Sequence, residues 1–158
     1  MDPKRELLRH TLATVGYRGG KAVRGATEDF GHFRGPEHVR EPVALLAHIG
    51  DLYDWALTLA KGAQEWRPSE PLAWEAEVAR FFETLERFDR YLASDEPLNT
   101  PAEQLFQGPV ADSLAHIGQL IMLRRLAGHP MRSENYARAD IVSGRVGRDQ
   151  TPPKREFD

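Results

Sequence analysis

The fold of this chain is decided by the stretch PLAWEAEVARFFETLERFDRYLA, residues Pro71–Ala93. Its large apolar residues recur at steps of 4, 3, 4, 3 and 4, at Trp74, Val78, Phe81, Leu85, Phe88 and Leu92. Because an α-helix turns once in 3.6 residues, side chains at this spacing share one face. The stretch therefore predicts a helix whose apolar seam packs against other helices in a bundle.

Three other segments show the same helical spacing: Pro3–Arg24, Pro42–Lys61 and a fourth that ends at Ala127. The fourth has two alternative starts. One is at Thr100, where Thr-Pro-Ala-Glu forms a capping box, and the other is at Pro109, after a break at Gly108. The alternating β-branched residues typical of strands are nearly absent. The sequence thus predicts an all-α fold, a four-helix bundle.

The lengths of the connections predict the directions of the helices. About fifteen residues join the first two helices, whereas fewer than ten join the second and third. A long connection can run the length of a bundle and leave its two helices parallel, while a short one makes them antiparallel. We therefore expect an up-up-down-down order. From His129 no periodic run remains, so we expect a bundle domain over 1–128 and an irregular C-terminal extension over 129–158, either disordered or wrapped on the bundle.

Composition excludes several kinds of chemistry. The 158 residues include 21 Lys and Arg against 24 Asp and Glu, a formal charge of -3, which offers no broad positive field for nucleic acid. Cysteine is absent, which removes disulfides, thiolate metal sites and cysteine nucleophiles, and leaves His, Asp and Glu as strong metal ligands. No apolar run is long enough to span a membrane. A cytoplasmic protein without a membrane or nucleic-acid partner is expected.

Two helices carry polar residues among apolar ones. Asp112 and His116 lie four residues apart on one face of the last helix, and His48 lies between Leu45 and Leu52 on the apolar stripe of the second. Two histidines and a carboxylate from separate helices are the parts of a divalent metal site with positions left open for water or substrate. The alternative is a hydrogen-bonded polar network within the core.

The surroundings of these residues suggest further roles. Because the last helix is apolar on two faces, we expect it to be largely enclosed, with Asp112 needing a partner for its charge. Gln119 follows His116 by one turn and Asp51 follows His48 by one turn, so both could orient metal ligands. Asp51 is also a candidate general base, and its alternative is a solvent-facing position.

Two segments resemble the DinB-like (DNA-damage-inducible, YfiT-like) superfamily of metalloenzymes. They are LLAHIGDLYDWAL, Leu45–Leu57, and GPVADSLAHIGQLIMLRRLAG, Gly108–Gly128. The resemblance implies an up-up-down-down four-helix bundle and a divalent metal held at positions that match His48, Asp112 and His116. The family more often has His where this chain has Asp112.

The same resemblance implies a cofactor and a reaction class. Zinc or nickel is the metal expected from the family, and the carboxylate of Asp112 shifts the preference toward iron or manganese. Relatives include thiol-dependent transferases and isomerases, so the resemblance implies an unidentified small-molecule substrate, with a low-molecular-weight thiol as a candidate, and commonly a homodimer. Metal-assisted hydrolysis is the other reaction class.

The alternative function is a non-catalytic dimeric helical bundle, acting as a binding or stress-response module. Leu114, Ile117 and Ile121 form a second apolar face on the last helix, which predicts a homodimer because exposing this face would leave an adhesive patch.

Overall fold

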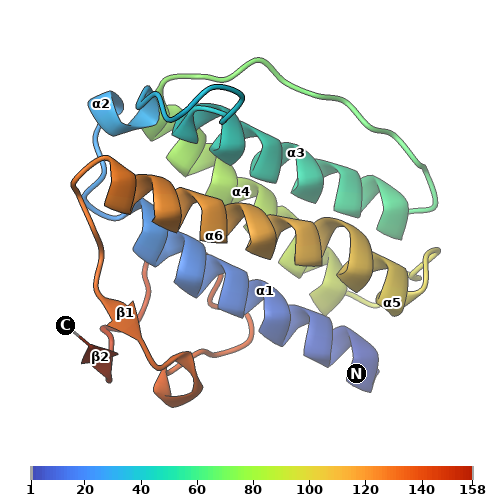
Figure 1. Ribbon diagram of the computed structural model, residues 1–158. Helices are drawn as coiled ribbons and strands as arrows, with labels where there is room; N and C mark the ends of the chain where they lie inside the picture. Colours follow the sequence, from blue (N-terminus) through green and yellow to red (C-terminus); the bar gives the residue numbers. More distant parts are fainter. Residues whose placement is uncertain (1, 158) are drawn as a thin grey trace.

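The computed structural model describes residues 2–157 and is predominantly helical, which confirms the all-α class (Figure 1). Its long helices are α1 (Pro3–Val23), α3 (Pro42–Ala60), α4 (Trp74–Ala93) and α6 (Ala111–Leu126). The shorter elements are α2 (Glu28–Gly31), α5 (Ala102–Leu105), a π-helical turn (Phe106–Val110), a 3-10 turn (Tyr136–Arg138) and the antiparallel strands β1 (Ser133–Glu134) and β2 (Glu156–Phe157). Among residues 2–157, no helix combines the length and the apolar character needed to cross a bilayer.

Proline marks the starts of two of the long helices. α1 and α3 begin at Pro3 and Pro42, where the missing N–H of proline costs nothing. α4 begins at Trp74 rather than at Pro71. The backbone N–H of Trp74 donates to Glu28 Oε2 at 3.0 Å, so a carboxylate from α2 caps α4 at this residue. The preceding connection is correspondingly longer than the sequence predicts.

The last long helix has no break at Gly108. Helical backbone starts at Ala102 and continues through Pro109 into α6. The turn that contains Pro109 is π-helical, and such a wider turn accommodates a residue that has no N–H to donate. Of the two predicted starts, the one near Thr100 is therefore close to the observed start, and the one at Pro109 is wrong.

α3 and α4 run parallel. Arg80 of α4 pairs with Asp51 of α3 at 2.5 Å, and Arg87, further along α4, pairs with Asp54, further along α3, at 2.6 Å. Both helices also begin beside α2 (Figure 1). The antiparallel arrangement predicted for this pair is wrong.

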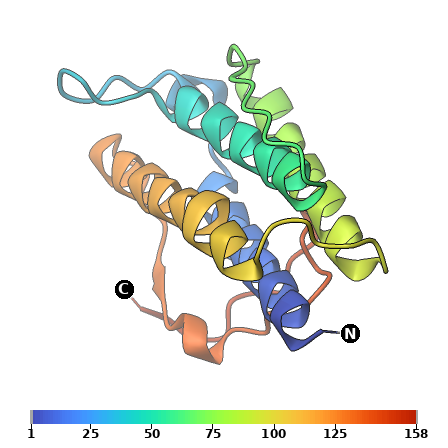
Figure 2. The same cartoon turned by 90° about the vertical axis from the view of Figure 1, so that its right-hand side faces the viewer.

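α1 runs against α3 and α4 and parallel to α6. Arg9, near the start of α1, pairs at 3.0 Å with Asp89, near the end of α4. Lys4 at the start of α1 pairs with Glu103 of α5, just before α6. α1 and α3 each pack against both α4 and α6 (Figure 2). The order is up-down-down-up, so the expected up-up-down-down order is wrong.

The connection over residues 61–73 explains this difference. It has no helix and runs back over the whole length of α3 (Figure 1). At ~3.3 Å per extended residue its reach is about 40 Å. The 19 residues of α3 rise only about 28 Å. The short connection 61–73 is therefore long enough to return along α3, because its chain is extended. The longer connection between α1 and α3 contains α2 and turns back at one end of the molecule.

The second apolar face of α6, formed by Leu114, Ile117 and Ile121, packs largely within the chain. Ile117 is only 1% exposed and belongs to the core, while Leu114 and Ile121 are half-buried against it. This face predicted a homodimer, but much of its apolar surface is already buried against other helices of the same chain. The dimer itself stays a prediction.

The C-terminal extension is wrapped on the helices over residues 129–157, on the side of α1 away from α3 (Figure 2). Its Glu134 side chain is fully buried, accepts a 2.6 Å hydrogen bond from Tyr17 and pairs with Lys21 at 2.8 Å. Val146 is 3% exposed and lies against Gly16, where an added Cβ would meet the Val146 carbonyl oxygen at 3.0 Å. A glycine in α1 thus lets the extension approach the helix backbone.

Candidate metal centre

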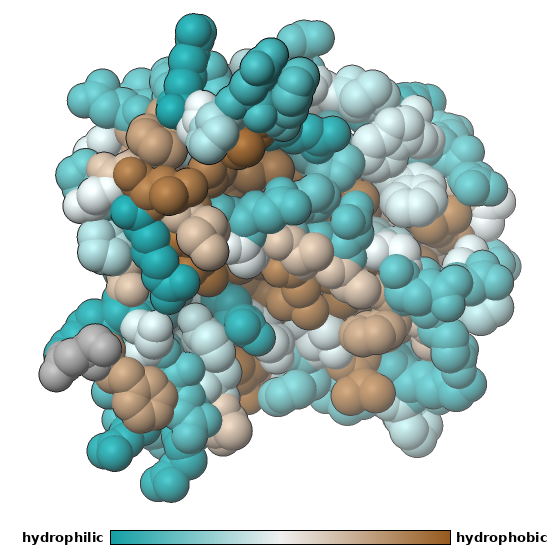
Figure 3. Space-filling model, viewed as in Figure 1, coloured by the Kyte–Doolittle hydropathy of each residue, from teal (hydrophilic) through white to brown (hydrophobic). Residues whose placement is uncertain are grey.

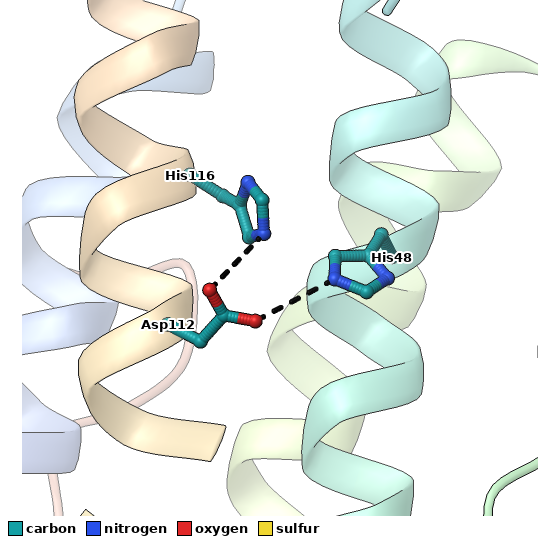
Figure 4. Close-up of side chains that lie close together, drawn as sticks. All are labelled: His48, Asp112 and His116. Atoms are coloured by element: carbon teal, nitrogen blue, oxygen red, sulfur yellow. Dashed lines mark ion pairs between the residues drawn. The ribbon is translucent and has the colours of Figure 1, made fainter. Parts of the chain in front are cut away.

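His48 of α3 and the pair Asp112 and His116 of α6 converge between the two helices (Figure 4). Asp112 Oδ1 lies 3.4 Å from His116 Nε2, and Asp112 Oδ2 lies 3.7 Å from His48 Nε2. One ligand atom from each residue lies within 4.8 Å of the others. The structure thus brings together the three residues that the sequence singled out.

Helix geometry and one buried hydrogen bond position these side chains. The four-residue spacing sets Asp112 and His116 on one face of α6, one turn apart. Beside them, the hydroxyls of Tyr53 on α3 and Ser113 on α6 lie 2.5 Å apart in the core. Burial raises the pKa of Tyr53, so this phenol stays protonated and keeps the bond. The bond fixes the register of α3 against α6 next to the centre.

One side of the centre is open to solvent. The side chain of Asp112 is 48% exposed, whereas those of His48 and His116 are 22% and 14% exposed. The expectation that α6 is largely enclosed is therefore wrong, because only one stripe of the helix faces the core. Asp112 is therefore in contact with water and is not the buried carboxylate that the sequence predicts.

Gln119 orients His116. Its Oε1 lies 3.0 Å from His116 Nδ1, and an amide oxygen only accepts hydrogen bonds. Nδ1 therefore carries the ring proton, and the lone pair of Nε2 faces Asp112. This is the arrangement by which proteins prepare a histidine for metal binding, and Gln119 takes the place expected of it.

Asp51 takes none of the roles expected of it. It is 4% exposed, pairs with Arg80 and accepts hydrogen bonds from the backbone N–H and the hydroxyl of Ser69. It neither faces solvent nor orients His48, and both of its oxygens are used by Ser69 and Arg80. Asp51 instead fastens the 61–73 connection and α4 to α3.

His48 is held in the form that can bind a metal. Burial is the largest cause and lowers its pKa; the charge of Arg40, and that of His116 when its ring is protonated, lower it further, while Asp112 opposes them. The net effect favours the neutral imidazole at neutral pH, and only a neutral imidazole has a lone pair to donate to a cation.

The separations between the ligand atoms are wider than direct hydrogen bonds. Direct N–H···O bonds measure about 2.7–3.2 Å, so the 3.4 and 3.7 Å separations are too long for good ones. Ligands with bonds of about 2.1 Å in tetrahedral geometry lie ~3.4 Å apart, and each imidazole lies at about that distance from one of the two Asp112 oxygens. The residues present therefore fit a divalent metal with two imidazoles and one carboxylate as ligands.

Two hollows flank the centre, and the sequence analysis identified neither. One, of about 480 Å³, is lined by His48, Asp112, Leu52 and two tryptophans, Trp55 and Trp66. The ring of Trp66, on the 61–73 connection, meets His48 edge-on with centroids 5.6 Å apart. The other hollow, of about 530 Å³, adjoins His116 and Gln119. Both are formed by segments distant in sequence, so no local pattern signals them.

Comparisons with protein-family profiles, with curated proteins and with solved structures found no match to this chain. The interpretation of the centre therefore depends on its residues and their geometry.

Proposed function

We propose that this protein is a metal-dependent enzyme that acts on a small molecule at a divalent cation held by His48, Asp112 and His116. The observation that carries the proposal is the convergence of these three side chains from two helices at ligand-to-ligand separations that suit a metal. Three protein ligands leave coordination positions for water or substrate, as in catalytic rather than structural sites.

The chain's own residues have separate tasks in this proposal. His48 and His116 would hold the cation through the Nε2 atoms that face Asp112, and Asp112 would supply an oxygen and a negative charge. Gln119 holds the His116 ring in place. The ring of Trp66 packs against that of His48, and both line the adjoining hollow. When bound, a divalent cation supplies Lewis acidity that polarises a substrate oxygen or lowers the pKa of a water or thiol.

We further propose that the chain belongs to the DinB-like superfamily and that its long helices form a four-helix bundle of that type. The two segments that carry the resemblance are α3 and the region from the π-helical turn through α6, and they hold the triad. The order of helix directions departs from the order that the resemblance implies. The proposal accordingly depends on these two helices rather than on the connections.

Metal content tests the proposal directly. We expect the purified protein, dialysed against zinc or nickel and then against buffer, to retain about one ion per chain by elemental analysis, as a single three-ligand site requires. His48→Ala and His116→Ala should each lose it. His10→Ala removes an exposed histidine of α1 and should retain it. Equal metal content in the three variants, or no bound metal in the intact protein, would contradict the proposal.

Cobalt substitution separates the two reaction classes. If the enzyme uses a thiol, adding cysteine to the cobalt-loaded protein should produce a thiolate-to-cobalt charge-transfer band that is absent from the His116→Ala variant. A spectrum that cysteine leaves unchanged would favour metal-assisted hydrolysis, which is then assayed with activated esters.

A further inference from the structure

The hollow beside His116 has the size of a small-molecule site. Its volume of about 530 Å³ lies within the range of roughly 300–1,000 Å³ typical of ligand pockets. One end is formed by His116 and Gln119 of the candidate metal centre, and the walls come from α6 and from the 32–41 connection. Figure 2 shows this connection projecting beyond α3 over the C-terminal half of α6.

The walls of this hollow are apolar and exposed. Val39, Met122 and Leu126 are 45%, 53% and 57% exposed, and all three line it. Hydrophobic side chains gather in the same place over the C-terminal end of α6 (Figure 3). Large apolar side chains that cluster beside polar groups typically mark a ligand groove.

Arg40 supplies the charge of the hollow. The lining residues include no aspartate or glutamate, so the guanidinium of Arg40 is the permanent charge among them. Within residues 2–157, Arg40 has no ion-pair partner, whereas Arg34 on the same connection pairs with Glu41 at 3.3 Å. Arg40 lines the same hollow as His116 of the candidate metal centre.

A strained turn directly precedes Arg40 in the chain. The N–H of Val39 donates to the Pro36 carbonyl oxygen at 3.1 Å, and His38, within the turn, has a φ of 71°. A residue other than glycine rarely adopts this left-handed conformation, and strain of this kind concentrates at functional sites. The turn places Val39 and Arg40 among the residues that line the hollow.

We propose that this hollow binds an amphipathic carboxylate as the substrate class. The carboxylate end meets Arg40 beside the metal centre, and the apolar body lies along Val39, Met122 and Leu126. A guanidinium recognises a carboxylate through paired, charge-assisted hydrogen bonds, and the apolar walls exclude water from the rest of the molecule. This inference deepens the proposed function and rests on it.

Octanoate and octan-1-ol are probes with matched apolar chains that differ in the carboxylate. We expect the metal-loaded protein to bind octanoate more tightly than octan-1-ol by calorimetry. Arg40→Gln should weaken octanoate binding about tenfold and leave octan-1-ol unchanged, since only the charged hydrogen bonds are lost. Arg34→Gln removes the same charge from the same connection outside the hollow and should leave both affinities unchanged.

The apolar walls have their own test. Leu126→Ser should weaken both probes several-fold, because the loss of buried apolar surface affects both chains alike. Leu7→Ser removes a comparably exposed leucine from α1, 68% exposed and outside the hollow, and should affect neither probe.

Metal content measured on the same samples separates the two proposals. Normal metal uptake with no octanoate binding, or equal octanoate affinity in Arg40→Gln and Arg34→Gln, would overturn this inference and leave the proposed function intact. An intact protein that takes up no metal would overturn the proposed function. Sedimentation that shows a dimer dissociated by Leu126→Ser would also overturn the inference, because a second copy would then occupy the hollow.

Discussion

Replacing Glu134 by Gln should destabilise the protein by about 2–3 kcal/mol without changing its affinity for metal. The side chain of Glu134 is fully buried, and its carboxylate binds the Tyr17 hydroxyl at 2.6 Å and the Lys21 ammonium at 2.8 Å. Burial alone lowers the pKa of Lys21, but its hydrogen bonds to Glu134 and Glu156 outweigh that effect and raise it. When Glu134 is neutralised, Lys21 loses this carboxylate partner and keeps Glu156 as the other one.

The size of the effect follows from what remains around that charge. Removing one partner of a buried ion pair typically costs about 3–5 kcal/mol, because the other charge is stranded. Lys21 keeps Glu156 at 3.1 Å, which compensates in part and reduces the expected loss. The double variant Lys21→Met, Glu134→Gln leaves neither Lys21 nor Glu134 as an unpaired charge. Its loss in free energy of unfolding should therefore be about 1–2 kcal/mol smaller than the sum of the losses of the two single variants.

Urea unfolding followed by circular dichroism measures this loss. With an m-value of about 2 kcal/mol/M, the midpoint of Glu134→Gln should fall by about 1–1.5 M. Glu103→Gln is the control, because Glu103 pairs with Lys4 at the surface and its loss should give no resolvable change. A midpoint for Glu134→Gln equal to that of the intact protein would show that the extension is not fastened by this pair.

Four further outcomes are expected. Gln119→Ala should weaken zinc binding at least tenfold in competition with a chelating dye, because the supported histidine loses its orientation, and an unchanged affinity would contradict this role. Saturation with metal at 100 times Kd should raise Tm by roughly 5–10 °C, a shift that a chelator reverses, and a Tm indifferent to metal would argue against the centre. Asp51→Asn should lower the free energy of unfolding by about 2 kcal/mol, because it weakens the buried pair with Arg80, and should leave zinc affinity unchanged. A loss of zinc binding in this variant would show that Asp51 supports the metal centre. Hydrogen bonds to its carboxylate partners, Glu41 first, raise the pKa of His32, so its NMR titration midpoint should exceed 6.5 and fall in Glu41→Gln. Because the folded-state pKa is the higher one, this stabilisation is complete at acidic pH and is lost as pH rises through that pKa.

Local patterns predicted the features that depend on one helix at a time. The apolar seam of Pro71–Ala93 and the prolines that open α1 and α3 identified the helical segments, because backbone hydrogen bonding and side-chain periodicity act over a few residues. The i,i+4 spacing of Asp112 and His116 likewise placed both on one face of α6. The assumption that this face is enclosed failed, because exposure is set by the neighbouring helices.

The directions of the helices and the surroundings of the centre depended on contacts between distant segments. The sequence by itself determined an all-α chain with an inward-facing histidine on one helix and a carboxylate and a histidine on another. Only the tertiary structure decided that α3 and α4 run parallel, that Gln119 rather than Asp51 supports the centre, and that Arg40 lines an apolar hollow. The physical reason is that an extended connection can cross a helix or turn back at almost equal cost in chain length, and packing of the whole core selects between these outcomes.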